Sequence, residues 1–330
     1  MLSLCDKYLQ VAATHLRQGR GEDALRALDA VLHMQPHHPQ AVDLKVQIYR
    51  SHELFEQAAD CLQDALQKHR DNPVWVLELA DLLINRLHRP ERALLWLDLL
   101  SEHNPRLSDR DLQKAYLLHA EALVDEEHMQ RAWELLRQAT FRFPENEELL
   151  FLFGWVALQT GKYYASASTL QKLQRINPQH ADAQYYLGMA YEGLGEYKLM
   201  RRQYHLTYEL DLRNPPLLVY GHREFELMVR ESLSKNGTQS WPDIPKVIRA
   251  YPSQQILADF PYDPRRMARL LNPVEAGIDG HDEELVLVLY QWNIERMNFS
   301  QEEMREEIRQ IVRHELVQFH SQPSLTQLLI

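Results

Sequence analysis

The sequence has 330 residues, of which 45% are hydrophobic, and a formal net charge of -11 at pH 7. This composition is typical of a chain that folds around an apolar core, and the length allows about two domains. The acidic balance, without a stripe rich in Lys and Arg, argues against a nucleic-acid or anionic-membrane partner, and the longest strongly apolar run, 285–290, is far shorter than a membrane span.

The N-terminal residues and the cysteines bear on the cellular compartment. The first ten residues, MLSLCDKYLQ, lack a basic segment followed by a long apolar one, so we expect no secretory signal. Cys5 and Cys61 are the only cysteines, which are too few for a disulfide framework or a cysteine-based zinc ribbon. We therefore expect a cytoplasmic protein.

A repeat of 34 residues runs through the first 215 residues. One small or apolar position recurs in register at Ala24, Ala58, Ala93, Ala132, Ser166 and Met200. A second recurs at Ala12, Val46, Ala120, Gly154 and Gly188, and a turn position recurs at Gly19, Glu53, Glu127, Gly161 and Gly195. Small residues let two helices approach closely, and glycine suits the left-handed end of a helix. The pattern predicts six helix-turn-helix units over residues 1–215, or about twelve helices, with no strand between residues 10 and 200.

These units resemble the tetratricopeptide repeat, a 34-residue helix-turn-helix unit. The clearest copies are GRGEDALRALDAVLHMQP, ENEELLFLFGWVALQTGKYYASASTLQKLQRINP and ADAQYYLGMAYEGLGEYKLMRRQYHL. The resemblance implies a mainly α fold, an α-solenoid whose first helices line a concave groove for a protein or peptide ligand.

The repeat phase also identifies candidate partner-binding residues. The positions projected into the groove are Gln47, Arg50, Lys114, Leu117, Glu121, Phe151, Trp155, Tyr185 and Met189. The aromatic residues among them suit an apolar or peptide anchor. The alternative is that these aromatic side chains pack between helices or against the C-terminal domain.

The 34-residue period ends near Asn214–Pro216, and the remaining residues predict a different class of structure. Apolar spacing at Phe225, Met228 and Leu233 predicts a helix over 221–236 that caps the sixth unit. The other expected elements are a loop at 237–245, a strand at 246–251, short helical or irregular segments at 253–260 and 263–273, a loop at 274–283, a strand at 285–291, and a helix at 300–320 whose Ser300 and Glu303 form a capping box. We therefore predict a small α+β domain over residues 216–330.

This order of elements resembles the small bacterial zincin-like metallopeptidase domain, a minimal zincin. The resemblance covers residues 216–320 and is clearest in LVLVLYQWNIERM and SQEEMREEIRQIVRHELVQFH. It implies a helix bearing H-E-x-x-H, whose two His side chains hold zinc while the Glu acts as general base.

The zincin motif is incomplete in this sequence. His314 matches the first ligand and Glu315 the base, but Gln318 stands at the position of the second His. His320 lies roughly 120° around the helix from His314, and no His, Cys, Asp or Glu follows it. We therefore expect no bound metal, with His314 and Gln318 as vestigial positions, zinc as the one cofactor to consider, and Glu315 catalytic only if the domain is active. The alternative is an unrelated domain in which His314 is an ordinary solvated residue.

Three functions are compatible with this sequence. The first is a protein-protein interaction or adaptor protein built on a tetratricopeptide-like solenoid, with an inactive zincin-like C-terminal domain. The second is a zinc-dependent metallopeptidase whose solenoid recruits the substrate. The third is a structural subunit of a larger complex. Gln318 favours the first over the second, because it removes a ligand that the enzyme needs.

Overall fold

The computed structural model describes residues 3–70, 72–100, 107–234, 244–253, 263–271, 285–297 and 300–321, with side chains up to Gln318 in the last range. Its contacts divide the chain into an N-terminal unit, Met1–Asn177, and a C-terminal unit, Pro178–Ile330. Most of the expected loop 237–245, the segment 254–260, the expected loop 274–283 and the residues after 321 lie outside the described residues, as does the side chain of His320. Across the residues described, no helix combines the length and the apolar character needed to cross a bilayer.

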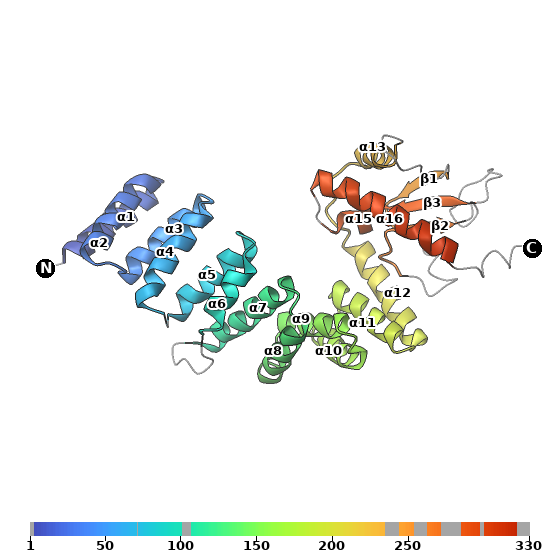
Figure 1. Cartoon of the computed structure of the whole chain (residues 1–330), viewed down its shortest axis with the longest axis horizontal. Helices are drawn as coiled ribbons and strands as arrows, with labels where there is room; N and C mark the ends of the chain where they lie inside the picture. Colours follow the sequence, from blue (N-terminus) through green and yellow to red (C-terminus); the bar gives the residue numbers. More distant parts are fainter. Residues whose placement is uncertain are drawn as a thin grey trace, which may run out of the picture. The chain divides into compact units, whose positions relative to one another are not determined.

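The N-terminal unit consists of helices joined by short turns (Figure 1). These helices are α1 (Leu4–Arg17), α2 (Gly21–Met34), α3 (Pro39–Ser51), α4 (Phe55–Lys68), α5 (Pro73–Asn85), α6 (Pro90–Leu97), α7 (Asp109–Asp125), α8 (Met129–Arg142), α9 (Glu147–Gln159) and α10 (Tyr163–Ile176). The C-terminal unit adds α11 (Ala181–Gly193) and α12 (Tyr197–Arg213). Twelve helices therefore precede residue 215 in the described part of the chain, and no strand is described between residues 10 and 200, as the repeat predicted.

Local sequence signals set where several of these helices begin. Ser3 and Ser108 accept hydrogen bonds from the backbone N–H groups of Asp6 and Asp111, whose carboxylates accept from the serine N–H groups in return. Pro39, Pro73 and Pro90 open their helices at positions where a missing N–H is harmless.

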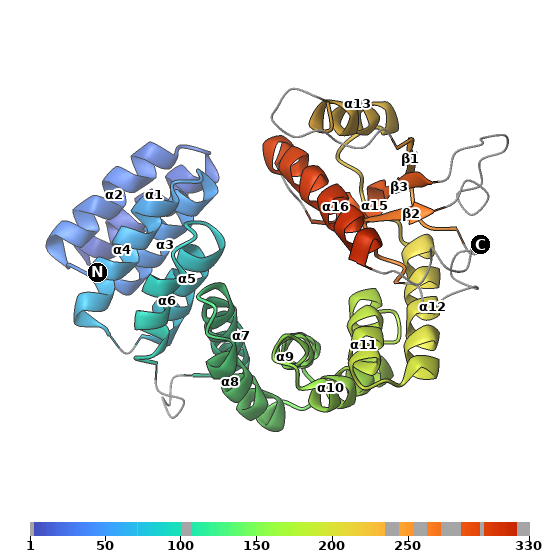
Figure 2. The same ribbon diagram turned by 45° about the vertical axis from the view of Figure 1, so that its right-hand side comes forward.

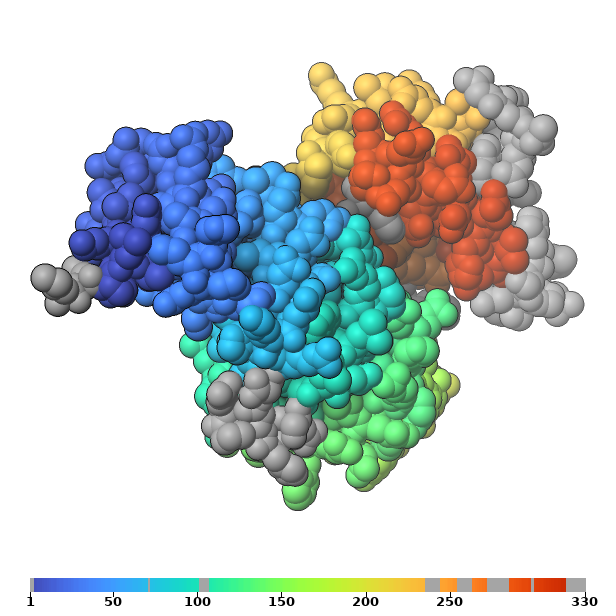
Figure 3. All heavy atoms as spheres, turned by 60° about the vertical axis from the view of Figure 1, so that its left-hand side comes forward, coloured from blue at the N-terminus to red at the C-terminus, as the bar shows by residue number. Residues whose placement is uncertain are grey.

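Small residues occupy the close contact within each helix pair, as expected from the repeat. Ala12, Ala24, Ala58, Ala93 and Ala132 are completely buried. On the face of the N-terminal unit shown in Figure 3, the side chains of successive repeats form a continuous surface. The alignment of small residues in the sequence thus identifies the core of each pair correctly.

The turn position of the repeat adopts a left-handed backbone whichever residue it carries. The φ angles of Gly19, Gly161 and Gly195 are 71°, 70° and 73°, and those of Glu53 and Glu127 are both 59°. A side chain at positive φ costs roughly 1 kcal/mol relative to glycine. The two glutamates therefore confirm that the repeat, and not the local residue, sets this conformation.

In the C-terminal unit, helices pack against a small sheet. Besides α11 and α12 it contains α13 (His222–Ser232), β1 (Lys246–Arg249), β2 (Ala268–Leu271), β3 (Val286–Tyr290), α15 (Gln291–Glu295) and α16 (Gln301–Ser321). The sheet has the order β1-β3-β2, with β1 parallel and β2 antiparallel to β3. The expected strands at 246–251 and 285–291, the helix at 300–320 and its Ser300–Glu303 capping box are confirmed.

Strand β2 corrects one sequence prediction. The sequence prediction for residues 263–273 is a short helical or irregular segment. Met267, Ala268, Arg269 and two leucines in this segment are residue types that favour helices. Pairing with β3 overrides this preference: Ala268 lies opposite Leu289, and Leu271 lies opposite Val286. Strand propensity depends strongly on such tertiary context, which a local segment does not contain.

The role predicted for the helix at 221–236 is also corrected. Phe225, Met228 and Leu233 of this segment are buried as expected. Their core partners, however, lie on the sheet and α16, and include Leu287, Leu289, Met304, Ile308 and Val312. Helix α12 is covered instead by an aromatic stack in which Tyr208 packs on Tyr251 and Tyr251 on Trp292. The last repeat presents aromatic and charged side chains there, which suit a polar junction better than an apolar cap.

The two ways of dividing the chain differ by one repeat. The contacts place the division between Asn177 and Pro178, whereas the repeat pattern continues to the end of α12 at Arg213. The sixth repeat thus shares a compact unit with the sheet. That a separate domain begins at residue 216 stays a prediction.

Candidate functional site

The predicted binding residues of the N-terminal unit lie on α3, α7 and α9, each of which is the first helix of its pair. Figure 2 shows α5, α7 and α9 following one another along one side of this unit, with α6, α8 and α10 along the other. Helix α7 contacts both α5 and α9. We call one stripe of side chains on α3, α5, α7 and α9 the first-helix face. It comprises Arg50 on α3, Glu78 and Asp81 on α5, Lys114, Glu121 and Asp125 on α7, and Glu148, Phe151 and Trp155 on α9.

Helical spacing explains why these side chains share a face. Residues three, four or seven positions apart lie on the same side of a helix. Glu148, Phe151 and Trp155 follow this spacing on α9, as do Lys114 and Glu121 on α7. Lys114 and Glu148 are exposed, whereas Phe151 and Trp155 are half-buried. Trp155 packs against the core, and part of its side chain remains exposed.

Charged groups on the first-helix face interact between neighbouring helices. Arg50 Nη1 donates to Glu78 Oε1 at 2.9 Å, and Arg50 Nη2 lies 3.5 Å from Asp81 Oδ2. Burial raises the pKa of Glu121, and the negative charges of Asp125, Asp81 and Glu148 raise it further. Carboxylates from three successive first helices are therefore close enough to repel one another.

Of the other four predicted residues, Gln47 on α3 is exposed and Leu117 on α7 is half-buried. Tyr185 and Met189 belong to α11 of the C-terminal unit, and both are half-buried. The Tyr185 hydroxyl donates to Asp263 Oδ2 at 2.9 Å, and the Arg265 guanidinium lies 4.9 Å from the centre of its ring. Burial raises the pKa of Asp263. Tyr185 thus packs against the C-terminal segment of its own chain, which is the alternative that the sequence left open.

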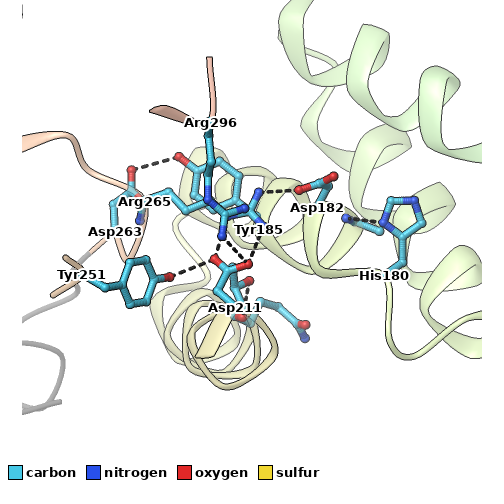
Figure 4. Close-up of polar contacts among 11 residues, drawn as sticks. His180, Asp182, Tyr185, Asp211, Tyr251, Asp263, Arg265 and Arg296 are labelled. Carbon is cyan, nitrogen blue, oxygen red and sulfur yellow. Dashed lines mark hydrogen bonds and ion pairs between the residues drawn. The ribbon is translucent and has the colours of Figure 1, made fainter. Parts of the chain in front are cut away.

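An ionic cluster that the sequence did not predict joins the last repeat to the sheet (Figure 4). Arg265 donates from Nε and Nη2 to the two carboxylate oxygens of Asp211, both at 3.0 Å, and from Nη1 to Asp182 at 2.6 Å. Asp211 also accepts from Tyr251 and from Arg296, each at 2.8 Å. Asp211 and Arg265 are 54 positions apart, and no spacing rule relates residues so distant in the sequence.

The His314–Glu315–Gln318 motif lies on α16 beside β2. The Arg266 guanidinium donates from Nη2 to Glu315 Oε2 at 2.8 Å and to Gln318 Oε1 at 2.9 Å. Glu315 Oε1 accepts from the backbone N–H of Leu270 at 3.1 Å, and Gln318 Nε2 donates to His314 Nε2 at 2.8 Å. These groups border a cavity of about 940 Å³ that α11, α12, α16 and the segment 263–269 line.

These contacts do not fit a zinc site. A guanidinium, itself a cation, lies within hydrogen-bonding distance of both Glu315 and Gln318, and the carboxylate is held against β2. Within the described residues, no group of three or more His, Cys, Asp or Glu side chains is placed to hold a metal ion. Through these hydrogen bonds, Glu315 connects α16 to β2.

Comparison with known proteins identifies the helical repeats. The family model described as tetratricopeptide repeat matches residues 12–42, 117–180 and 151–199. The chain contains tetratricopeptide repeats. The matches end at residue 199, so the resemblance of residues 216–320 to a minimal zincin stays a prediction. No curated protein matches the sequence.

Several solved tetratricopeptide-like structures resemble the chain at low identity. PilW, described as a widely conserved type IV pilus biogenesis factor, is 15% identical over 69% of this chain and 100% of its own, with a TM-score of 0.48. PilF of Pseudomonas aeruginosa is 14% identical over 69% of this chain and 97% of its own, with a TM-score of 0.49. YrrB, described as having an unusual peptide-binding site, is 20% identical over 63% of this chain and 86% of its own, with a TM-score of 0.34. Likeness at this level does not carry a function to this chain.

Removal of metal separates a structural role for the α16 motif from a catalytic one. We expect purified protein to contain well under one zinc ion per chain, and its free energy of unfolding to be unchanged by a chelator. Glu315→Gln should lower that free energy by about 1–3 kcal/mol, because it weakens the part-buried, charge-assisted hydrogen bond between Arg266 and Glu315. Elemental analysis and urea unfolding provide the measurements. Stoichiometric zinc, with chelator-sensitive proteolysis that Glu315→Gln abolishes, would contradict this interpretation.

Proposed function

We propose that this chain is a protein-protein interaction protein, an adaptor, that holds a polypeptide segment on the first-helix face of its tetratricopeptide repeats. The observation that carries the proposal is the set of side chains on that face, including Lys114, Phe151 and Trp155, that remain exposed or half-buried after the helices have packed. Aromatic and arginine side chains at such positions are frequent anchors of protein interfaces.

The contacts of the C-terminal unit favour this function over peptide hydrolysis. A general base must be able to reach a metal-bound water. Glu315 is engaged instead by Arg266 and by the Leu270 N–H. The proposal includes a non-catalytic domain, zincin-like in fold, over residues 216–330. It also places the chain in the cytoplasm, because thiols such as its two free cysteines stay reduced there.

A structural subunit of a larger complex is the second candidate, and the exposed apolar residues of the second helices favour it. Phe141 on α8 is 90% exposed and Tyr164 on α10 is 80% exposed. A subunit held by a large assembly would bury residues such as these as well as the first-helix face. The two functions therefore differ in which side of the repeats a partner covers.

A pair of phenylalanines on adjacent helices tests the proposal. Peptides selected from a displayed random library against the purified chain should lose at least tenfold in affinity on Phe151→Ala, because truncating an interface anchor costs about 1.4 kcal/mol or more. Phe141→Ala, on the other side of the repeats, should change the affinity less than twofold. Fluorescence anisotropy with labelled peptides measures both.

Circular dichroism and thermal unfolding verify that both phenylalanine variants fold. If the selected peptides lose affinity on Phe141→Ala and not on Phe151→Ala, the first-helix face is not the binding surface. If the library yields no peptide that binds the wild-type chain, the chain does not recognise a short segment, and the structural-subunit function is preferred.

A further inference from the structure

The first-helix face combines aromatic surface with an excess of negative charge. Five of its charged side chains are carboxylates, namely Glu78, Asp81, Glu121, Asp125 and Glu148, and two are cations, Arg50 and Lys114. Phe151 and Trp155 lie one and two turns beyond Glu148 on the same side of α9. The face therefore places an apolar surface beside a negative one.

One arginine of the chain itself already lies among these carboxylates. The Arg50 guanidinium, from α3, lies between two carboxylates of α5, at 2.9 Å from Glu78 and 3.5 Å from Asp81. Its side chain and those of the two carboxylates remain partly exposed. A guanidinium can thus bridge side chains of this face without being removed from solvent.

Further along the face, Glu121 lies among other carboxylates. Burial and the like charges of Asp125, Asp81 and Glu148 all raise the pKa of Glu121. Lys114 lies seven residues before Glu121 on α7, which is about 10 Å along the helix axis. A positive charge brought between α5, α7 and α9 would relieve the repulsion among these groups, and the gain is largest where water is partly excluded.

We propose that the polypeptide held on the first-helix face carries a Lys or Arg that docks among Asp81, Glu121 and Glu148, next to an apolar side chain that packs on Phe151 and Trp155. This inference rests on the proposed function, since it names the partner chemistry of the same surface. Opposite charge across the interface sets orientation and partner choice, while the aromatic anchors supply most of the affinity.

The test uses the peptides selected from the displayed library. They should be enriched in Lys or Arg beside an aromatic or aliphatic residue. Replacing that Lys or Arg by Gln in the peptide should weaken binding about tenfold, and Glu121→Gln in the protein should weaken it by a similar factor. The two changes together should weaken binding no more than about either one alone, because they remove the same contact.

Glu134→Gln is the matched control, since Glu134 is an acidic residue on the second helix α8, and it should leave the affinity unchanged. Removing a half-buried negative charge does not threaten the fold, so Glu121→Gln remains interpretable. The affinity of the wild type should also fall as the pH is lowered through the raised pKa of Glu121, and this dependence should be weaker in Glu121→Gln.

The outcomes separate this inference from the proposed function. Peptides that need Phe151 but lack basic residues, and that bind Glu121→Gln as well as wild type, would overturn the inference and leave the proposed function intact. Enrichment of acidic peptides would overturn it as well. Loss of binding on Phe141→Ala alone would refute the proposed function, and this inference with it.

Discussion

Asp211→Asn is expected to lower the stability of the C-terminal unit by about 3–5 kcal/mol, the usual cost of removing one partner of a buried ionic cluster. The Asp211 side chain is only 3% exposed and binds Arg265, Arg296 and the Tyr251 hydroxyl. Asparagine keeps the size of the side chain but not its charge. Two guanidinium groups would then face each other in a part-buried site without their shared counter-charge.

The position of Asp211 in its helix supports this expectation. It lies in the last turn of α12, where the helix dipole disfavours a negative charge. The carboxylate is tolerated there because it accepts from Arg265 through both oxygens at 3.0 Å. The cluster ties the sixth repeat to the segments around β1, β2 and α15, so its loss should loosen the unit as a whole.

Asp182→Asn is the matched control, because Asp182 binds the same arginine at 2.6 Å with a side chain that is 51% exposed. Exposed ion pairs contribute about 0–1 kcal/mol, so this variant should be close to wild type. Amide hydrogen exchange under native conditions measures both, with the amides of α5 and α7 as the reference in the N-terminal unit. Equal effects of the two substitutions would refute the argument from burial.

The features that the sequence predicted well are those that depend on neighbours within one repeat. Complete burial of Ala24 and the left-handed turns at Gly19 and Glu127 follow from the contact between two helices of a pair. The partner of each such residue lies within about one repeat length, so the 34-residue period contains the information needed. The same rule projects the candidate partner-binding positions, and their role in binding stays a prediction.

The features that the sequence did not predict depend on partners far along the chain. Glu315 was weighed as a general base, yet its hydrogen-bond partners, Arg266 and the Leu270 N–H, lie 49 and 45 residues earlier. Strand β2 is strand-like only because β3 lies beside it. Nothing local distinguishes these segments from helical ones, so chemistry that depends on them requires the three-dimensional contacts.

Gly154→Ala is expected to destabilise the N-terminal unit by about 1–3 kcal/mol, although alanine is the better helix former. A Cβ atom at this position would lie 2.5 Å from Leu170 Cγ and 2.6 Å from Leu170 Cδ2. Leu170 is completely buried on α10, and the Ser166 hydroxyl on the same helix donates to the Gly154 carbonyl at 2.7 Å. The side chain and the backbone are therefore both held, and α9 must move away from α10 to admit the methyl group.

The sign of the Gly154→Ala effect follows from two opposing terms. Helix propensity alone would stabilise the variant by about 1 kcal/mol, so a measured loss means that the packing term exceeds this gain. The same repeat position on α7 carries Ala120, which is completely buried. Ala120→Gly is thus the matched control, and it should destabilise by about 1 kcal/mol or more through lost packing and propensity. Urea unfolding of the two variants gives both values, and a Gly154→Ala variant more stable than wild type would mean that the α9–α10 contact yields easily.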